Sequence, residues 1–282
     1  MKWYGETGAK GAEIRTTQYG PIHEITYADA KKFAAALKKA GIRVTALAPF
    51  IGKCDLRKED EVKQHLAWLD HVLNLAPLFE TTKVRAFYGL RFNDIPSMAD
   101  KVLEFGRRLC DALPDGTDIL VENEPATGGV LLEQVVYFCQ QIDPKRFKII
   151  LDPGNYGYCV ELARALAVTG TTMQAMLKAD VQEFYEHVDL VHAKNACSVS
   201  PVQADTVALD DGGGIVDFTA LLRVFKELGL FVPIDLEPHR KEAGQQLDEA
   251  TRTFPGMAGY AGPENATHDF NALKRMIAEV QG

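Results

Sequence analysis

The 282-residue sequence lacks any apolar run approaching the roughly 18 residues that a membrane-spanning helix requires. It also lacks an excess of positive charge, because 31 lysines and arginines face 39 aspartates and glutamates, for a formal net charge of −8. Proteins that bind nucleic acid usually present a basic face, so this balance argues against that class. The N-terminal segment has no apolar core of a secretory signal. We therefore expect no membrane and no nucleic-acid partner.

Cysteine is scarce, and its spacing excludes two kinds of site. The five cysteines are Cys54, Cys110, Cys139, Cys159 and Cys197. Their number is odd and no CxxC or CxxH spacing occurs, which argues against a disulfide framework and a thiolate zinc site. A cytoplasmic location fits this usage. No GxGxxG or GxxxxGK[ST] motif follows an apolar run, which disfavours dinucleotide-binding and P-loop proteins.

What the sequence does contain is a soluble globular composition, with 46% apolar and 25% charged residues. Short β-rich runs alternate with longer segments of helical spacing. The predicted strands are Ala12–Thr16, Ile42–Ala48, Lys83–Leu90, Asp118–Asn123, Phe147–Asp152, Leu190–Lys194 and Val232–Glu237. The predicted helices are Tyr27–Ala40, Arg57–Leu75, Met98–Leu113, Leu131–Ile142, Val216–Leu228 and His268–Val280. Helical returns make successive strands parallel, which predicts a doubly wound sheet or a (β/α)8 barrel.

Polar residues at strand ends favour the barrel. Glu122, Asp152, His192 and Glu237 stand at the carboxyl ends of the late strands. In a barrel all these ends converge on one mouth, whereas in an open sheet they lie progressively farther apart. Seven strands are predicted rather than eight, and no segment before Ala12 has room for a strand and a crossover. We therefore expect an α/β, TIM (β/α)8-type barrel whose first strand is missing or incomplete, unless the native chain begins upstream.

The same four residues make a metal site. Strand side chains alternate between faces, and each of the four shares its face with other inward-pointing positions. Singly, each has an ordinary structural explanation, such as turn formation by Asp152 before Pro153-Gly154. Together, three carboxylates would repel one another and raise one another's pKa, and a divalent ion relieves that conflict. Three oxygen ligands and one imidazole favour Mn²⁺ or Mg²⁺ and leave Co²⁺ and Zn²⁺ open.

Six segments carry a resemblance to a known family. They are Gly11–Arg15, Ile119–Asn123, Leu151–Asn155, Val191–Asn195, Asp211–Phe218 and Ile234–His239. In this order they resemble the xylose-isomerase-like TIM-barrel superfamily of sugar-phosphate isomerases and epimerases. The resemblance covers nearly the whole chain and implies one domain over residues 1–282. It implies that Glu122, Asp152, His192 and Glu237 bind one divalent metal ion and that the two glutamates also exchange protons with the substrate.

The resemblance implies a metal-dependent isomerase or epimerase of a sugar or sugar phosphate that works through a metal-stabilised enediolate. The ketose epimerases it resembles place a histidine three residues after the aspartate, where this chain has Asn155. They also place an arginine shortly after the metal histidine, where this chain has Ala196-Cys197-Ser198. An inosose-dehydratase-like lyase and a non-catalytic metal- or sugar-binding barrel therefore stay open. The related DNA-repair nucleases rank last, because their extra metal-binding histidines are missing.

Three further residues are candidate contacts to a small sugar or polyol substrate. Asn155 is a hydrogen-bond partner, and Lys194 shares the face of His192. A structural ion pair between Lys194 and a barrel carboxylate is an equal alternative. His239 follows Glu237 by two residues, with a loop role as its alternative. Family habit adds the expectation of a homo-oligomer, namely a dimer.

Overall fold

The computed structural model describes residues 2–90, 95–159, 162, 166, 168–200, 203–237 and 263–282. They belong to two compact units. The first comprises Met1–Ile150 with His187–Leu190, and the second comprises Leu151–Glu186 with Val191–Gly282. No helix within these described ranges combines the length and apolar character needed to cross a membrane.

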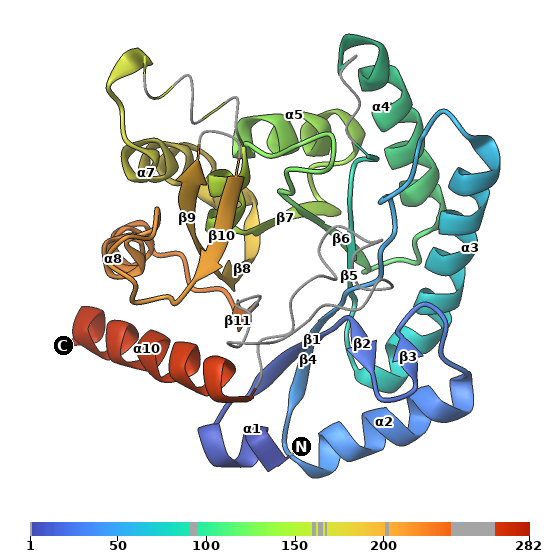
Figure 1. Cartoon of the computed structure of the whole chain (residues 1–282). Helices are drawn as coiled ribbons and strands as arrows, with labels where there is room; N and C mark the ends of the chain where they lie inside the picture. Colours follow the sequence, from blue (N-terminus) through green and yellow to red (C-terminus); the bar gives the residue numbers. More distant parts are fainter. Residues whose placement is uncertain are drawn as a thin grey trace. The chain divides into compact units, whose positions relative to one another are not determined.

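Seven strands follow one another in the hydrogen-bonded order β1-β4-β5-β6-β7-β8-β11 (Figure 1). They are β1 (Gly11–Ile14), β4 (Arg43–Leu47), β5 (Lys83–Ala86), β6 (Asp118–Glu122), β7 (Phe147–Leu151), β8 (Val188–Ala193) and β11 (Ile234–Leu236). The pairs β1–β4, β4–β5, β5–β6, β6–β7 and β8–β11 are parallel. Each strand overlaps a predicted one, so the predicted α/β order of seven parallel strands is confirmed. Residues 2–7 form helix α1 (Lys2–Thr7), so no strand precedes β1 in this described stretch.

The α-helices of the first unit that follow β1 overlap the predicted ones, and local sequence signals mark both ends of α2 (Tyr27–Lys39). The others are α3 (Glu59–Leu75), α4 (Ile95–Ala112) and α5 (Leu132–Ile142), and the short 3-10 helix η1 (Ala76–Phe79) follows α3. The Thr26 hydroxyl accepts a hydrogen bond from the backbone N–H of Asp29 and caps α2. Gly41 adopts φ +69° just after this helix, a conformation that glycine accepts without strain. A small hairpin, β2 (Thr16–Thr17) with β3 (Gly20–Pro21), completes this unit.

A fully buried apolar cluster in the first unit contains residues that stand two positions before three of the predicted ligands. Ala46, Leu120, Ile150 and Leu190 have no exposed surface and pack together. Strand side chains repeat on one face every second residue, so the next positions toward the carboxyl end on that face belong to Glu122, Asp152 and His192. Three predicted ligands thus continue the strand face that begins with buried apolar residues.

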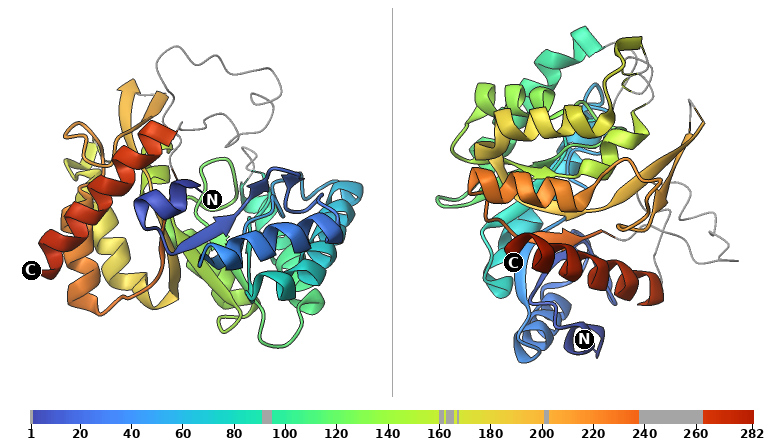
Figure 2. Two further views of the ribbon diagram at one scale, coloured as in Figure 1. Left: turned by 90° about the horizontal axis from the view of Figure 1, so that it is seen from below. Right: turned by 90° about the vertical axis from the view of Figure 1, so that its left-hand side faces the viewer.

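The second unit contains the remaining helices and a hairpin that the sequence did not predict. Its elements are the 3-10 helix η2 (Pro153–Tyr158), α7 (Met173–Phe184), the hairpin β9 (Asn195–Ser200)–β10 (Gln203–Val207), α8 (Phe218–Leu228) and α10 (Pro263–Gln281), and η3 (Tyr185–His187) begins at its edge. Helix α10 runs beside α8 (Figure 2). Arg223 of α8 forms an ion pair with Glu279 of α10, and Lys226 donates to the carbonyl of Val280. Helix α7 and the hairpin were both missed by the sequence analysis.

Candidate metal centre

Asp152 is held at the end of β7 by a short helical turn. It caps η2, with Pro153 in the first turn, and its Oδ1 accepts a hydrogen bond of 3.0 Å from the backbone N–H of Asn155. Gly154 permits the close approach of this turn to the end of β8, because a Cβ there would lie 2.8 Å from the carbonyl oxygen of Lys194. The carboxylate of Asp152 is therefore fixed and has no exposed surface.

Parallel strand pairing brings the other two predicted ligands of the second unit to the same place. Asp235 of β11 pairs with His192 of β8, and the backbone N–H of Glu237 donates to the carbonyl of Ala193 over 3.2 Å. Glu237 thus directly follows β11 beside the end of β8. Because η2 also approaches the end of β8, Asp152, His192 and Glu237 converge.

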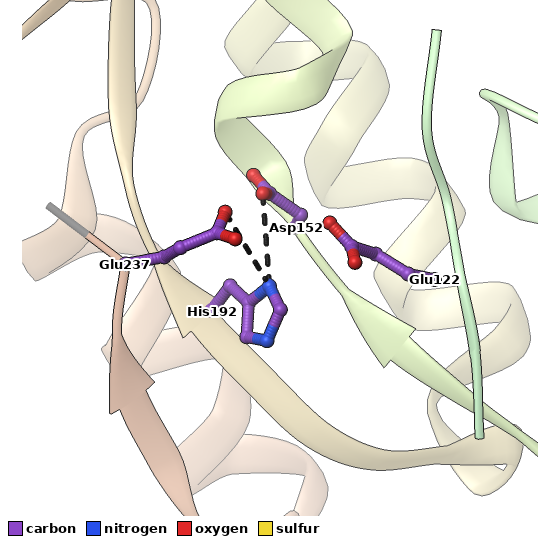
Figure 3. A group of neighbouring side chains, drawn as sticks. All are labelled: Glu122, Asp152, His192 and Glu237. Atoms are coloured by element: carbon purple, nitrogen blue, oxygen red, sulfur yellow. Dashed lines mark ion pairs between the residues drawn. The ribbon is translucent and has the colours of Figure 1, made fainter. Parts of the chain in front are cut away.

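The geometry of these three side chains fits a divalent cation (Figure 3). His192 Nδ1 lies 3.8 Å from Asp152 Oδ2 and 3.7 Å from Glu237 Oε2. Each of the three offers a ligand atom, and these atoms lie within 4.8 Å of one another. Two atoms bound at about 2.1 Å to one ion lie roughly 3 to 4 Å apart, depending on the coordination angle. The observed separations fall in that range, so one ion can reach all three groups.

Lys194 supplies the positive charge of this site. Its Nζ pairs with Asp152 Oδ2 and lies 2.9 Å from Glu237 Oε2, the same two oxygens that face His192. The Lys194 side chain is only 4% exposed, so both carboxylates are compensated in a place that water hardly reaches. Burial raises the pKa of the Asp152 carboxyl, the Lys194 ammonium opposes that rise, and the charge of Glu237 adds to it. These oxygens therefore attract cationic charge strongly.

Glu122 belongs to the first unit and reaches the neighbouring strand end by register. It is the last residue of β6 and pairs with Ile150 of β7, two residues before Asp152. Its side chain is 2% exposed, and its Oε2 accepts a hydrogen bond of 3.0 Å from Arg85 Nη1. Adjacent parallel strands thus carry Glu122 and Asp152 at their carboxyl ends.

Arg85 is a site residue that the sequence analysis missed. It lies within β5, is buried, and also lies 3.4 Å from Glu13 Oε1 through the same Nη1. A single arginine inside the otherwise apolar stretch Val84–Tyr88 is the signal that could have found it, because a buried charge needs a partner.

The remaining predicted contacts have different outcomes. Asn155 is buried inside η2, and its backbone N–H is engaged with Asp152. For Lys194, the structure contains the ion pair with barrel carboxylates that the sequence analysis gave as one alternative. His239 lies outside the described residues.

A buried amide anchors the chain just after Lys194 and was not predicted. The Asn195 side chain accepts from the backbone N–H of Val216 over 3.1 Å and donates to its carbonyl over 3.1 Å. A Cβ at Gly214 would lie 2.2 Å from Asn195 Nδ2, so glycine is required there. The loop before α8 is thereby fixed to the end of β8.

Comparison with protein families gives one match over nearly the whole chain. Residues 1–275 match the model of the family described as xylose isomerase-like TIM barrel. A search of the curated proteins finds no match.

Solved structures with the same fold are numerous, and three illustrate the range. The IolI protein with a bound zinc atom is 14% identical, covers 99% of this chain and 92% of its own, and has a TM-score of 0.71. The D-psicose 3-epimerase of Clostridium cellulolyticum H10, solved with D-tagatose, is 12% identical, covers 99% and 91%, and has a TM-score of 0.70. A xylose isomerase-like TIM barrel protein of Mycobacterium smegmatis in complex with magnesium is 14% identical, covers 98% and 86%, and has a TM-score of 0.65. Identities this low show the fold alone.

Proposed function

Because the chain belongs to the xylose isomerase-like TIM barrel family, we propose that it is a metal-dependent isomerase or epimerase of a sugar or sugar phosphate. The observation that carries the proposal is the convergence of Asp152, His192 and Glu237 on ligand atoms within 4.8 Å of one another. Buried carboxylates gathered in this way are costly unless positive charge is added. Lys194 supplies one positive charge to Asp152 and Glu237, and a bound divalent cation would supply the rest.

Glu122 is the fourth ligand in this proposal. Its support is the register of β6 on β7, which sets it beside the strand that leads into Asp152. Three carboxylates and one imidazole suit Mn²⁺ or Mg²⁺, and the structures with zinc and magnesium show that barrels of this fold accept either ion. When bound, the ion polarises a substrate carbonyl and stabilises the negative charge that develops when a proton leaves the adjacent carbon.

The two glutamates carry the proton. One carboxylate accepts it as the C–H bond next to the carbonyl breaks, and the other returns a proton to carbon. Return to the opposite face of the same carbon gives an epimer, whereas return to the neighbouring carbon interchanges an aldose and a ketose. Glu237 is suited to contact substrate because its side chain is 15% exposed, while Asp152 and His192 are sealed. Asn155, Lys194 and His239 complete the substrate contacts in this proposal.

An assay that follows both metal and proton tests the proposal directly. Anomalous scattering from crystals grown with manganese should reveal one ion on the four ligands. Incubation with ketoses and keto-inositols in deuterium oxide should label the carbon next to the carbonyl, as detected by NMR. Asp152→Asn should lose both properties, and Asp189→Asn should keep both, because Asp189 pairs with Lys83 at the opposite end of its strand. Metal without labelling of any sugar would instead indicate a binding protein.

A lyase of the inosose-dehydratase kind is the second candidate, and Lys194 favours it. Dehydration removes the same proton but must also expel the hydroxyl of the next carbon as water, which leaves an enol that becomes a ketone. The leaving hydroxyl needs a proton donor, and the ammonium of Lys194 stands at both Asp152 and Glu237. In the same assay a lyase would produce a dehydrated ketone, whereas an isomerase would conserve the mass of the sugar.

A further inference from the structure

Arg85 makes contacts with three other strand segments of the first unit. From β5, its Nη1 donates to Glu122 Oε2 at the end of β6 over 3.0 Å, and its Nη2 donates to the carbonyl of Ala48, just after β4, over 3.1 Å. The same Nη1 lies 3.4 Å from Glu13 Oε1 of β1. The guanidinium carbon lies 5.1 Å from the centre of the Phe87 ring. The plane and the direction of the guanidinium are thus fixed from several sides.

We propose that Arg85 is a positioning residue that sets the orientation of the Glu122 carboxylate for metal binding and proton transfer. This inference rests on the proposed function. Its basis is geometric: Glu122 is only 2% exposed, and Arg85 Nη1 binds one of its two oxygens. Holding Oε2 restricts rotation of the carboxylate, so Oε1 has a defined direction.

The chemistry of the two basic side chains explains why arginine occupies this position. Guanidinium is planar and stays charged, and its donors leave in fixed directions, so it serves a carboxylate and a backbone carbonyl together. An ammonium on a flexible stem at the same position keeps the charge but cannot hold both acceptors with that geometry. The substitution Arg85→Lys therefore separates the role of geometry from the role of charge.

Arg146 offers a matched control in the same unit. It stands before β7, at the opposite ends of the strands, and donates to the carbonyls of Pro114 over 2.8 Å and Thr117 over 3.3 Å. The substitution Arg146→Lys also removes a guanidinium that donates hydrogen bonds to several acceptors. It removes a comparable structural anchor but touches no predicted ligand.

The experiment compares wild type with both variants in three measurements. Titration calorimetry gives the manganese affinity, and the rate of deuterium incorporation into the sugar gives kcat and KM. Thermal unfolding gives the stability. Groups that orient metal ligands typically change metal affinity or activity by about 10–100-fold when replaced. We expect Arg85→Lys to lose that much in manganese affinity or in kcat, with little change in KM, while Arg146→Lys lowers only the unfolding temperature.

Each outcome has one reading. If Arg85→Lys keeps wild-type affinity and kcat and loses only thermal stability, Arg85 is a scaffold residue and the inference is wrong, although the proposed function stands. If wild type itself neither binds manganese nor labels any sugar, the proposed function is wrong, and the inference that rests on it is wrong too. Loss of affinity in both lysine variants would show general loosening of the unit and would also overturn the positioning role.

Discussion

Two buried cations neutralise predicted metal ligands, and they do so in different ways. In the first unit, Arg85 binds Glu122 and also a backbone carbonyl, so part of its hydrogen bonding belongs to the scaffold. In the second unit, the Lys194 ammonium pairs with Asp152 and Glu237, two predicted ligands. The arginine therefore binds partly to the backbone of its unit, whereas the lysine pairs with two side chains that are proposed above to bind a metal ion.

This difference separates a permanent partner from an exchangeable one. In the proposed function, a divalent ion held by Asp152 and Glu237 would compete with Lys194 for their carboxylates. The ammonium would then lose part of its attraction to these carboxylates and would become available to a substrate hydroxyl. Nothing comparable happens at Arg85, since the carbonyl of Ala48 is not a proposed ligand and continues to hold the guanidinium.

The largest expected effect is the loss of stability from Arg85→Met. Removal of one partner of a buried ion pair typically costs about 3–5 kcal/mol, because the remaining charge stays in the interior. Here two carboxylates, Glu13 and Glu122, lose the guanidinium. Saturating manganese should restore only part of the lost stability, because the ion does not replace the contact to the Ala48 carbonyl. Chemical denaturation with and without manganese measures this recovery. If manganese restored the full free energy of unfolding, a metal ion could replace Arg85 as completely as it is expected to replace Lys194, and the contrast between the two residues would be wrong.

Lys194→Met is expected to have a smaller effect than Arg85→Met, and it should strengthen metal binding. The substitution removes a positive charge that competes for two ligand oxygens, so manganese should bind at least about tenfold more tightly, or about 1.4 kcal/mol. Without metal the variant should unfold at a lower temperature, and saturating manganese should restore the wild-type value. Calorimetric titration measures the affinity, and differential scanning calorimetry measures the restoration. Weaker manganese binding would mean that Lys194 organises the ligands rather than replacing the ion.

From the sequence, Lys194 is singled out as a candidate site residue, with an ion pair as one of two alternatives, whereas Arg85 is not singled out. The reason is the distance along the chain over which each signal can be read. His192 and Lys194 share one strand and alternate in a pattern that is visible locally. The contact from Arg85 to Glu122 depends on the register of two strands. Arg85 pairs with Leu120, and its long side chain reaches diagonally to the residue two positions farther on. Such a register cannot be read from either strand alone.

The fold shows the same limit. All seven strands were predicted because their continuous apolar runs are local signals, and α2 was predicted because Gly41 marks its end. Helix α7 was missed, since its buried residues are only Leu177 and Val181, a weak periodic signal. The hairpin β9–β10 was missed because its pairing, and its packing against η2, depend on tertiary contacts.

The stability of the protein in acid should depend on buried histidines of the first unit rather than on the Arg85 ion pairs. Burial, together with the charges of His65 and His71, lowers the pKa of His23 to about 4, and burial lowers the pKa of His65 to about 4. A histidine whose folded-state pKa lies below its unfolded value of 6.5 stabilises the fold above that pH. This stability is lost as the pH falls from 6.5 towards 4, because the unfolded chain takes up the proton first.

The substitution His23→Phe should flatten that pH dependence. Phenylalanine keeps an aromatic ring beside Phe50 and Trp68, whose rings lie 5.6 and 4.3 Å from that of His23. Guanidinium denaturation at several pH values between 4 and 7 provides the measurement. Arg85→Lys is the comparison, because it leaves His23 and His65 unchanged, and the pH dependence of its stability should match that of wild type. If the free energy of unfolding of His23→Phe depended on pH as steeply as that of wild type, another group would be responsible for the loss of stability in acid.

The smallest effect is expected at an exposed ion pair, which serves as a reference for the stability contribution of the buried pairs. Arg223 and Glu279 join α8 to α10, and their side chains are 54% and 58% exposed. Water and salt screen such a pair, and exposed pairs typically contribute about 0–1 kcal/mol. Arg223→Ala should therefore change the free energy of unfolding by no more than about 1 kcal/mol and leave manganese affinity unchanged. The same denaturation series in high salt should reduce even this difference, whereas the loss in Arg85→Met should persist. A salt-sensitive loss in Arg85→Met would mean that the Glu122 pair is reached by solvent, contrary to its burial.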